Sequence, residues 1–154
     1  MRLEPLFEMH ADLKPGVPVG PGPQGTRSIV DVTGGRFSGA RLRGRILPSG
    51  GDWLLIRPDG ASALLDVRIT FETHDGAFVY VTYYGVIELS AAAQAALAAP
   101  EGGSTEYGDH YFVTQPRFET GDPRYAWLND VVAVAEGRLR PQAVEYRVFH
   151  VRPG

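Results

Sequence analysis

The residues with the clearest capacity for chemistry lie in SGGDWLLIRPDGASALLD, residues 49–66. Asp52 follows two glycines and precedes Trp53, and Asp66 ends the segment. A carboxyl group held against an indole ring in a dry pocket has a raised pKa, which suits proton transfer near neutral pH. The segment therefore predicts Asp52 as a catalytic acid or base, Trp53 as the apolar wall of a ligand site, and Asp66 as a second candidate acid.

A structural role is an alternative for both acids. Gly50 and Gly51 can adopt positive φ, Asp52 can accept a hydrogen bond from a nearby backbone amide, and Trp53 can fill the core. Asp66 can lie on a solvated outer strand face that carries ion pairs. The two interpretations of Asp52 differ in whether its loss affects a reaction or the stability of the fold.

Further residues are candidates for binding a ligand. Tyr80 is one of seven tyrosines, and its hydroxyl could hold a carbonyl or phenol group of a ligand. The segment PRFETGDPRYAWLND, residues 116–130, adds Arg117, Trp127 and Asn129. Because Asn is depleted in strands, Asn129 is expected either as an inward-facing amide that orients a ligand or as part of a bulge or strand-end cap.

Composition argues against several classes of function. Lys and Arg number 15 against 18 Asp and Glu, with no basic stripe, so nucleic acid and membrane are not expected as partners. The absence of cysteine removes disulfides and thiol chemistry and, with no signal-peptide pattern in the first residues, predicts a cytoplasmic protein. The four histidines lack metal-ligand spacing, and there is no phosphate loop or Gly-x-Ser-x-Gly elbow, so no metal or other cofactor is expected.

Strands must position these side chains. The 154 residues, 44% of them hydrophobic, predict one domain spanning residues 1–154. The segment 14–25, rich in Gly and Pro, is expected to be a loop. Residues 89–99 are the one helix candidate, with Ser90 as N-cap and Pro100 as stop. Strands are expected near residues 3–13, 26–32, 40–47, 53–57, 63–73, 78–89, 109–119, 126–137 and 142–151.

The clearest local signal is a β-hairpin centred on Asp75 and Gly76, a type I′ turn signature. With these two as the turn residues, Phe71 faces Tyr80 across the ladder, and Tyr80 lies on the opposite face of the sheet from Asp66. One face of the first strand then carries only apolar side chains, namely Leu65, Val67, Ile69 and Phe71.

About eight strands and one short helix predict an all-β fold, an antiparallel barrel or sandwich. A closed barrel leaves no exposed edge strands, and one of about eight strands can hold a small ligand in its mouth. The other face of the hairpin is mixed, since Val79, Val81, Tyr83 and Gly85 of the second strand join Asp66 there. Such a mixed face is expected inside a ligand-binding barrel, which keeps Asp66 a candidate.

Several short segments together carry a family resemblance over nearly the whole chain. They are Gly-Gly-x-Phe-x-Gly at 34–39, Gly-Gly-Asp-Trp at 50–53, Asp-Gly at 75–76, Phe-Glu-Thr at 118–120 and Trp-Leu-Asn at 127–129. The chain resembles uncharacterised-protein family 0311, also called domain of unknown function 3237. The resemblance implies a single antiparallel β-barrel, lipocalin-like or allene-oxide-cyclase-like, and implies no activity.

These features predict a barrel that binds a small molecule. As an enzyme it would be a cofactor-free isomerase, cyclase or lyase acting on a small aromatic or carbonyl-bearing metabolite, with a carboxylate moving a proton and Tyr or Asn stabilising the developing oxyanion. The first alternative is a non-catalytic small-ligand-binding protein, and turnover separates the two. The second is a structural subunit whose outer barrel face forms a homodimer.

Overall fold

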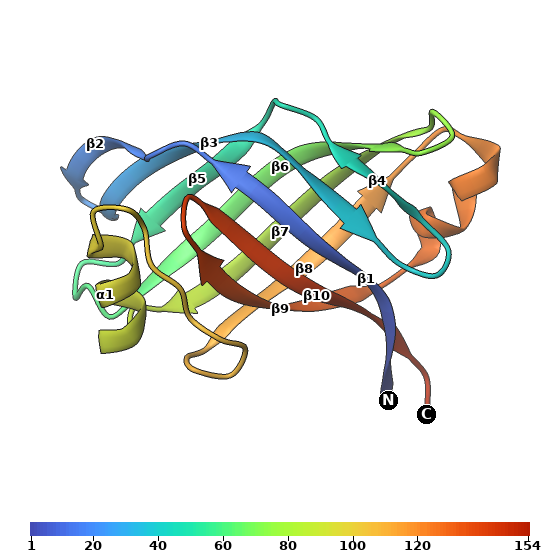
Figure 1. The fold of residues 1–154 in the computed structure, drawn as a ribbon. Helices are drawn as coiled ribbons and strands as arrows, with labels where there is room; N and C mark the ends of the chain where they lie inside the picture. The colour runs from blue at the N-terminus through green and yellow to red at the C-terminus, as the bar shows by residue number, and fades with distance from the viewer.

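The computed structural model describes residues 1–154, and it is a closed antiparallel β-barrel of 8 strand positions with two helices. The ring closes because β1 pairs with both β10 and β3, while β4 and β5 share the position between β3 and β6. The all-β barrel expected from the sequence is confirmed. The elements are β1 Arg2–Leu13, β2 Val17–Gly22, β3 Gly25–Ser38, β4 Arg43–Ile46, β5 Gly51–Ile56, β6 Ser62–Thr73, β7 Phe78–Glu88, α1 Ala91–Ala98, β8 Phe112–Glu119, the 3₁₀ helix η1 Pro123–Asp130, β9 Ala133–Arg140 and β10 Ala143–Arg152 (Figure 1).

The two helices lie at opposite ends of the barrel. Figure 1 shows α1, in yellow, at one end and η1, in orange, at the other. The expected helix is confirmed as α1, where the Ser90 side chain accepts a hydrogen bond from the backbone amide of Ala93 at 3.2 Å. Neither helix is long and apolar enough to cross a membrane.

Two segments differ from the sequence prediction. Residues 14–25 are not wholly a loop, because β2 forms within them and pairs with β3 alone. This strand tolerates Pro18 and Pro21 because it has a free edge, where a missing N–H leaves no ladder partner unpaired. Residues 126–130 belong to η1 and not to a strand, since Asp122 caps a helix that begins at Pro123, a residue suited to the first helical turn.

The β6–β7 hairpin is confirmed, but its predicted register is wrong by one residue. The backbone amide of Thr73 donates to Ala77 O at 2.8 Å, and Gly76 has φ of 88°. The loop therefore has three residues and ends on a glycine in the left-handed conformation. The Asp-Gly pair fits this loop as well as it fits a two-residue turn. Phe71 consequently faces Val79, and Val67 faces Tyr83.

The corrected register decides which tyrosine enters the barrel. The apolar face of β6 is buried, so the mixed face with Asp66, which suited the inside of a ligand-binding barrel, lies outside. Tyr83 joins the barrel interior, whereas Tyr80 and Tyr84 lie outside and are 41% and 54% exposed. A slip of one residue moves a side chain to the other face of the sheet, because successive side chains alternate.

Aromatic packing fills the end of the barrel near η1. The rings of Phe37 and Phe71 stack with centroids 4.1 Å apart, and Phe7 packs edge-on against both of them and against Phe118. These four phenylalanines are almost fully buried. The opposite half of the interior, toward α1, is where the barrel is hollow.

Candidate functional site

A cavity of about 350 Å³ opens at the α1 end of the barrel. The loop that follows β1, the end of α1 and the β9–β10 turn surround it. Its side walls are mostly aliphatic and come from β3, β5, β6, β7 and β10. The apolar wall residues include Val30, Val32, Leu54, Leu65, Val67, Ile87 and Val144.

Asp52 lines this cavity because of how β5 enters the barrel. Gly50 has φ of 85°, and a Cβ at that position would clash with the backbone carbonyl of Arg68. A Cβ at Gly51 would lie 2.7 Å from Val30 O. The glycine pair thus lets β5 begin between the backbones of β3 and β6, which directs the next side chain inward. The positive φ predicted for the pair is found at Gly50 alone.

The Asp52 carboxylate also takes part in the β5–β6 sheet. Its Oδ1 accepts a hydrogen bond from the backbone amide of Asp66 at 3.0 Å. The ladder pairs Asp52 with Val67 and resumes only at Leu55 and Leu64, so the carboxylate lies where the ladder is interrupted. Asp52 therefore combines the two predicted environments, a bond to a backbone amide and a place in a cavity wall.

Burial raises the pKa of Asp52 from 3.8 to about 6. The amide hydrogen bond from Asp66 lowers this pKa, the negative charge of Asp66 raises it, and Arg27 lowers it. Trp53 contributes no apolar wall, which corrects the sequence prediction. It lies on the outer face, 37% exposed, with the Arg68 guanidinium 5.2 Å from its ring centroid.

Tyr83 and Tyr146 are the cavity residues that sequence reasoning missed. Both line the cavity, both are nearly fully buried, and their rings meet edge-on at 5.4 Å. Burial is the main cause of their raised pKa values, and the negative charge of Asp52 raises both further. The alternation Val144, Tyr146, Val148 along β10 is the signal that would have indicated Tyr146 as inward-facing.

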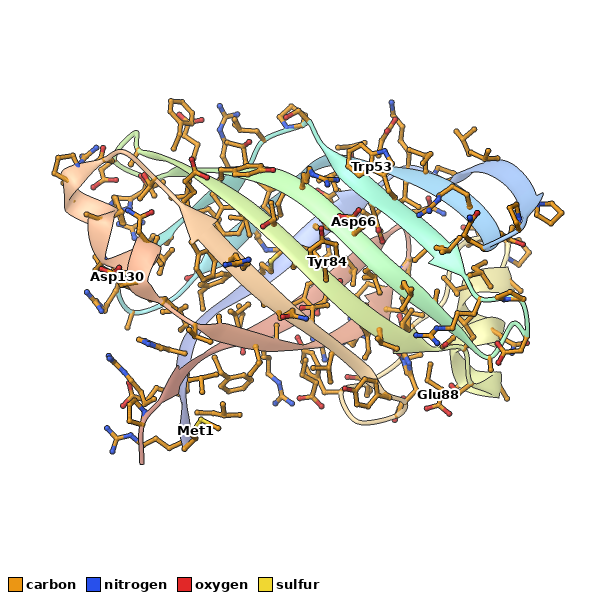
Figure 2. All side chains as sticks on the ribbon, turned by 180° about the vertical axis from the view of Figure 1, so that it is seen from behind. Met1, Trp53, Asp66, Tyr84, Glu88 and Asp130 are labelled. Carbon is orange, nitrogen blue, oxygen red and sulfur yellow. The ribbon has the colours of Figure 1, made fainter.

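Other predicted site residues lie on the outer surface of the barrel. Asp66 forms an ion pair with Arg68 at 3.4 Å and does not line the cavity. Figure 2 shows Trp53, Asp66 and Tyr84 together on the outer side of the sheet. Tyr80 and Arg117 are also exposed on this outer side, which is reasonable for side chains that alternate with the buried residues of β7 and β8.

Trp127 and Asn129 lie in η1, at the far end of the barrel from α1 (Figure 1). Asn129 pairs with Thr120 in both directions, accepting from its amide at 2.9 Å and donating to its carbonyl at 3.0 Å. These two bonds cap the end of β8, which is the strand-end cap expected as the alternative role of Asn129. The Arg41 guanidinium stacks 3.6 Å from the Trp127 ring centroid. The predicted convergence of the candidate residues on one cavity is therefore wrong, and Asp52 alone among them reaches it.

Few groups are placed to hold a metal or a charged cofactor. No group of three or more His, Cys, Asp or Glu side chains lies close enough together to hold a metal ion. The cations of the cavity, Lys14 and Arg140, belong to its mouth, in the loop after β1 and at the end of β9. What the interior offers chemically is a carboxyl group, two phenols and apolar walls.

A family model described as protein of unknown function (DUF3237) matches residues 1–151. The chain belongs to this family. A UPF0311 protein of Rhodopseudomonas palustris is 34% identical over 131 residues, covering 82% of this chain and 81% of the relative. A second, from Bradyrhizobium diazoefficiens, is 33% identical over 150 residues, covering 95% and 93%. The resemblance seen in the sequence is thus confirmed.

Solved structures of similar proteins share the barrel. A protein from Rhodopseudomonas palustris superposes with a TM-score of 0.88 at 31% identity, covering 99% of each chain. A β-barrel-like protein from Acinetobacter baumannii gives 0.82 at 34% identity, covering 98% of this chain and 96% of that one. An enzyme from Penicillium herquei gives 0.69 at 21% identity, covering 98% and 94%, which shows a shared fold.

One relative belongs to a biosynthetic gene cluster. PR-toxin biosynthesis cluster protein 7 of Penicillium roqueforti is 28% identical over 159 residues, covering 90% of this chain and 83% of the relative.

Proposed function

We propose that this DUF3237 protein is a cofactor-free enzyme that moves a proton on a small aromatic or carbonyl-bearing metabolite, as an isomerase, cyclase or lyase. The observation that carries the proposal is the position of Asp52, a carboxyl group with a pKa of about 6 in the wall of an otherwise apolar cavity. A general acid or base is most effective when its pKa lies near the working pH. At neutral pH, Asp52 is ionised but remains easy to protonate.

The surroundings of Asp52 support this role. The phenols of Tyr83 and Tyr146 share the cavity with it and supply neutral hydrogen-bond donors for a ligand oxygen. The aliphatic walls exclude water and strengthen electrostatic interactions with the bound ligand. We assign the activity to the cytoplasm, since a chain without cysteine suits a reducing compartment.

The relatives are compatible with an enzyme of small-molecule metabolism. One belongs to a toxin biosynthesis cluster, and a more distant protein of the same fold is an enzyme. These statements concern those proteins, and they raise the expectation of catalysis for this chain by analogy alone.

A non-catalytic small-ligand-binding protein is the second candidate. The observation that favours it is the hydrogen bond from the Asp66 amide to Asp52, because it gives the carboxylate a place in the sheet that needs no reaction. In this case Asp52 and the phenols would only orient a ligand. Such a protein would saturate with ligand and release it unchanged.

Substitution of the two acids of the 49–66 segment tests the proposal. The compounds retained by the purified protein from cell extract are identified by native mass spectrometry, and their conversion is then followed with the wild type, Asp52→Asn and Asp66→Asn. Asp52→Asn is expected to reduce turnover by about 10²–10⁴-fold, because the amide keeps the shape but not the base. Asp66→Asn is the matched control, since Asp66 lies outside the cavity, and its turnover should stay near that of the wild type.

Two results would contradict the proposal. Equal turnover in the wild type and Asp52→Asn would remove Asp52 from the reaction. Saturable binding of the retained compound without any product would establish the binding protein instead.

A further inference from the structure

The polar groups inside the cavity define which hydrogen-bond donors and acceptors a ligand needs. The ionised Asp52 carboxylate accepts hydrogen bonds or a proton. Tyr83 and Tyr146 carry one neutral O–H donor each. The interior thus presents one carboxylate acceptor and two neutral phenolic donors to a ligand.

Charge excludes an anionic reacting group. Arg140 is held at the mouth by Glu106 at 3.2 Å and by the carbonyl of Thr105 at 2.9 Å, and the Nζ of Lys14 lies 3.9 Å from Oδ2 of Asp31. Neither cation is therefore free to neutralise a negative charge beside Asp52. Because two like charges in a cavity of low polarity repel strongly, the part of the ligand next to Asp52 must be neutral.

The cavity volume sets the size of the ligand. An apolar protein cavity of about 150 Å³ binds benzene. The cavity of about 350 Å³ here is roughly twice as large. It therefore fits a molecule of about two rings, with aliphatic walls that suit an apolar body.

We propose that the substrate is a neutral ketone of about two rings that has a C–H bond next to its carbonyl group, with the carbonyl oxygen bound by the Tyr83–Tyr146 pair. This inference rests on the proposed function of Asp52. The Asp52 carboxylate takes the proton, the electron pair of the C–H bond becomes a C=C bond, and the carbonyl π pair moves onto oxygen. That oxygen accepts hydrogen bonds from the phenols. Asp52 then returns the proton to the opposite face of the same carbon, which inverts its configuration, or to the far end of a C=C bond conjugated with the enolate, which moves that double bond. Either reaction is an isomerisation that needs no oxidant or reductant.

An enolate fits this set of groups. As the C–H proton moves to the carboxylate, negative charge develops on the carbonyl oxygen, where neutral phenolic donors can stabilise it.

Deuterium exchange of a simple ketone tests the inference. The probe is 2-tetralone, a two-ring ketone with an acidic C–H next to its carbonyl, followed in D₂O by proton NMR. Its aromatic enol analogue 2-naphthol is titrated in parallel by fluorescence. The wild type is expected to accelerate exchange over buffer, and Asp52→Asn to abolish most of that acceleration.

The phenol pair is tested by the double variant Tyr83→Phe with Tyr146→Phe, and by each single variant. Phenylalanine keeps both rings, so near-ultraviolet circular dichroism should show intact packing. The double variant is expected to slow exchange by about 10²-fold and to weaken 2-naphthol binding, because the oxygen loses its donor. Tyr84→Phe is the matched control on the outer face of the same strand and should behave as the wild type.

The outcomes separate this inference from the proposed function. Exchange that depends on Asp52 but not on either phenol would overturn the inference and leave the role of Asp52 standing. Exchange that survives Asp52→Asn would overturn both. Binding of 2-naphthol without any exchange of 2-tetralone would overturn the ketone as the substrate class, and failure to bind 2-naphthol would overturn the ligand size.

Discussion

The two halves of the barrel interior are built from the same strands but have opposite character. Toward η1, Phe7, Phe37, Phe71 and Phe118 pack ring against ring. Toward α1, β5 contributes Asp52 and β7 contributes Tyr83 around an open volume. The barrel interior is thus divided into a packed half and a hollow half, and the candidate site lies in the hollow one.

Side-chain size along β6 and β7 accounts for much of this division. The inward positions of β6 near the hairpin are Ile69, Phe71 and Thr73, whereas those toward the start of the strand are Ala63, Leu65 and Val67. Large rings fill one end and smaller aliphatic groups leave space at the other, since interiors are close-packed wherever side chains can reach one another. A carboxyl group is tolerated at the hollow end because it keeps a hydrogen bond and can take up a proton.

Removing a ring from the packed half is expected to have the largest effect on stability. Phe71→Ala should lower the free energy of unfolding by about 3–5 kcal/mol, because it loses burial and leaves a void among three other rings. Urea titration at pH 7 measures this loss. The pKa of Asp52 should not change, and a loss below about 1 kcal/mol would mean that the packed half is not the main source of stability.

Removing the carboxyl charge of Asp52 from the hollow half should raise the free energy of unfolding, whereas Phe71→Ala lowers it. The pKa of Asp52 rises from 3.8 in the unfolded chain to about 6 in the fold, so the folded state binds the proton more tightly. Asp52 therefore reduces stability as pH rises from about 4 to about 6, and the full cost, about 3 kcal/mol, is present above pH 6. Asp52→Asn should stabilise the protein by up to this amount at pH 8 and by little at pH 4.

Thermal or urea unfolding of the wild type and Asp52→Asn across pH 4–8 measures this difference. Asparagine retains an oxygen that can accept from the Asp66 amide, so the sheet contact is kept in both proteins. Parallel stability curves with no pH-dependent gap would show that the carboxyl group is not desolvated.

The smallest effects are expected outside both halves. Tyr80→Phe should change the free energy of unfolding by less than about 0.5 kcal/mol and leave ligand affinity unchanged, since the hydroxyl lies on the outer surface. The comparison is Tyr83→Phe, three residues away, which removes a hydroxyl inside the cavity. Calorimetric titration of both variants with 2-naphthol distinguishes them, and equal affinities would argue that the ligand binds elsewhere.

Alternation and turn residues were enough to predict most of the scaffold. The period-two pattern of β6 separated its apolar face from its mixed face, and Ser90 and Pro100 marked the single α-helix. Such features are local, because they depend on neighbouring residues along one strand or on one helical turn. Asp52 was identified in the same way, from an acid that follows two glycines at the start of a strand.

The register between strands and the closure of the barrel determined where the remaining site residues lie. Asp75-Gly76 is compatible with a two- or three-residue loop, and that single residue decides whether Tyr80 or Tyr83 faces inward. Trp127 and Asn129 lie at the far end because η1 forms there, and Tyr146 meets Tyr83 only after the barrel closes across β10 and β1. The sequence thus determined which side chains alternate on each strand, whereas only tertiary structure decided which strands bring their inward faces together, since contacts across a barrel depend on the register of every strand between them.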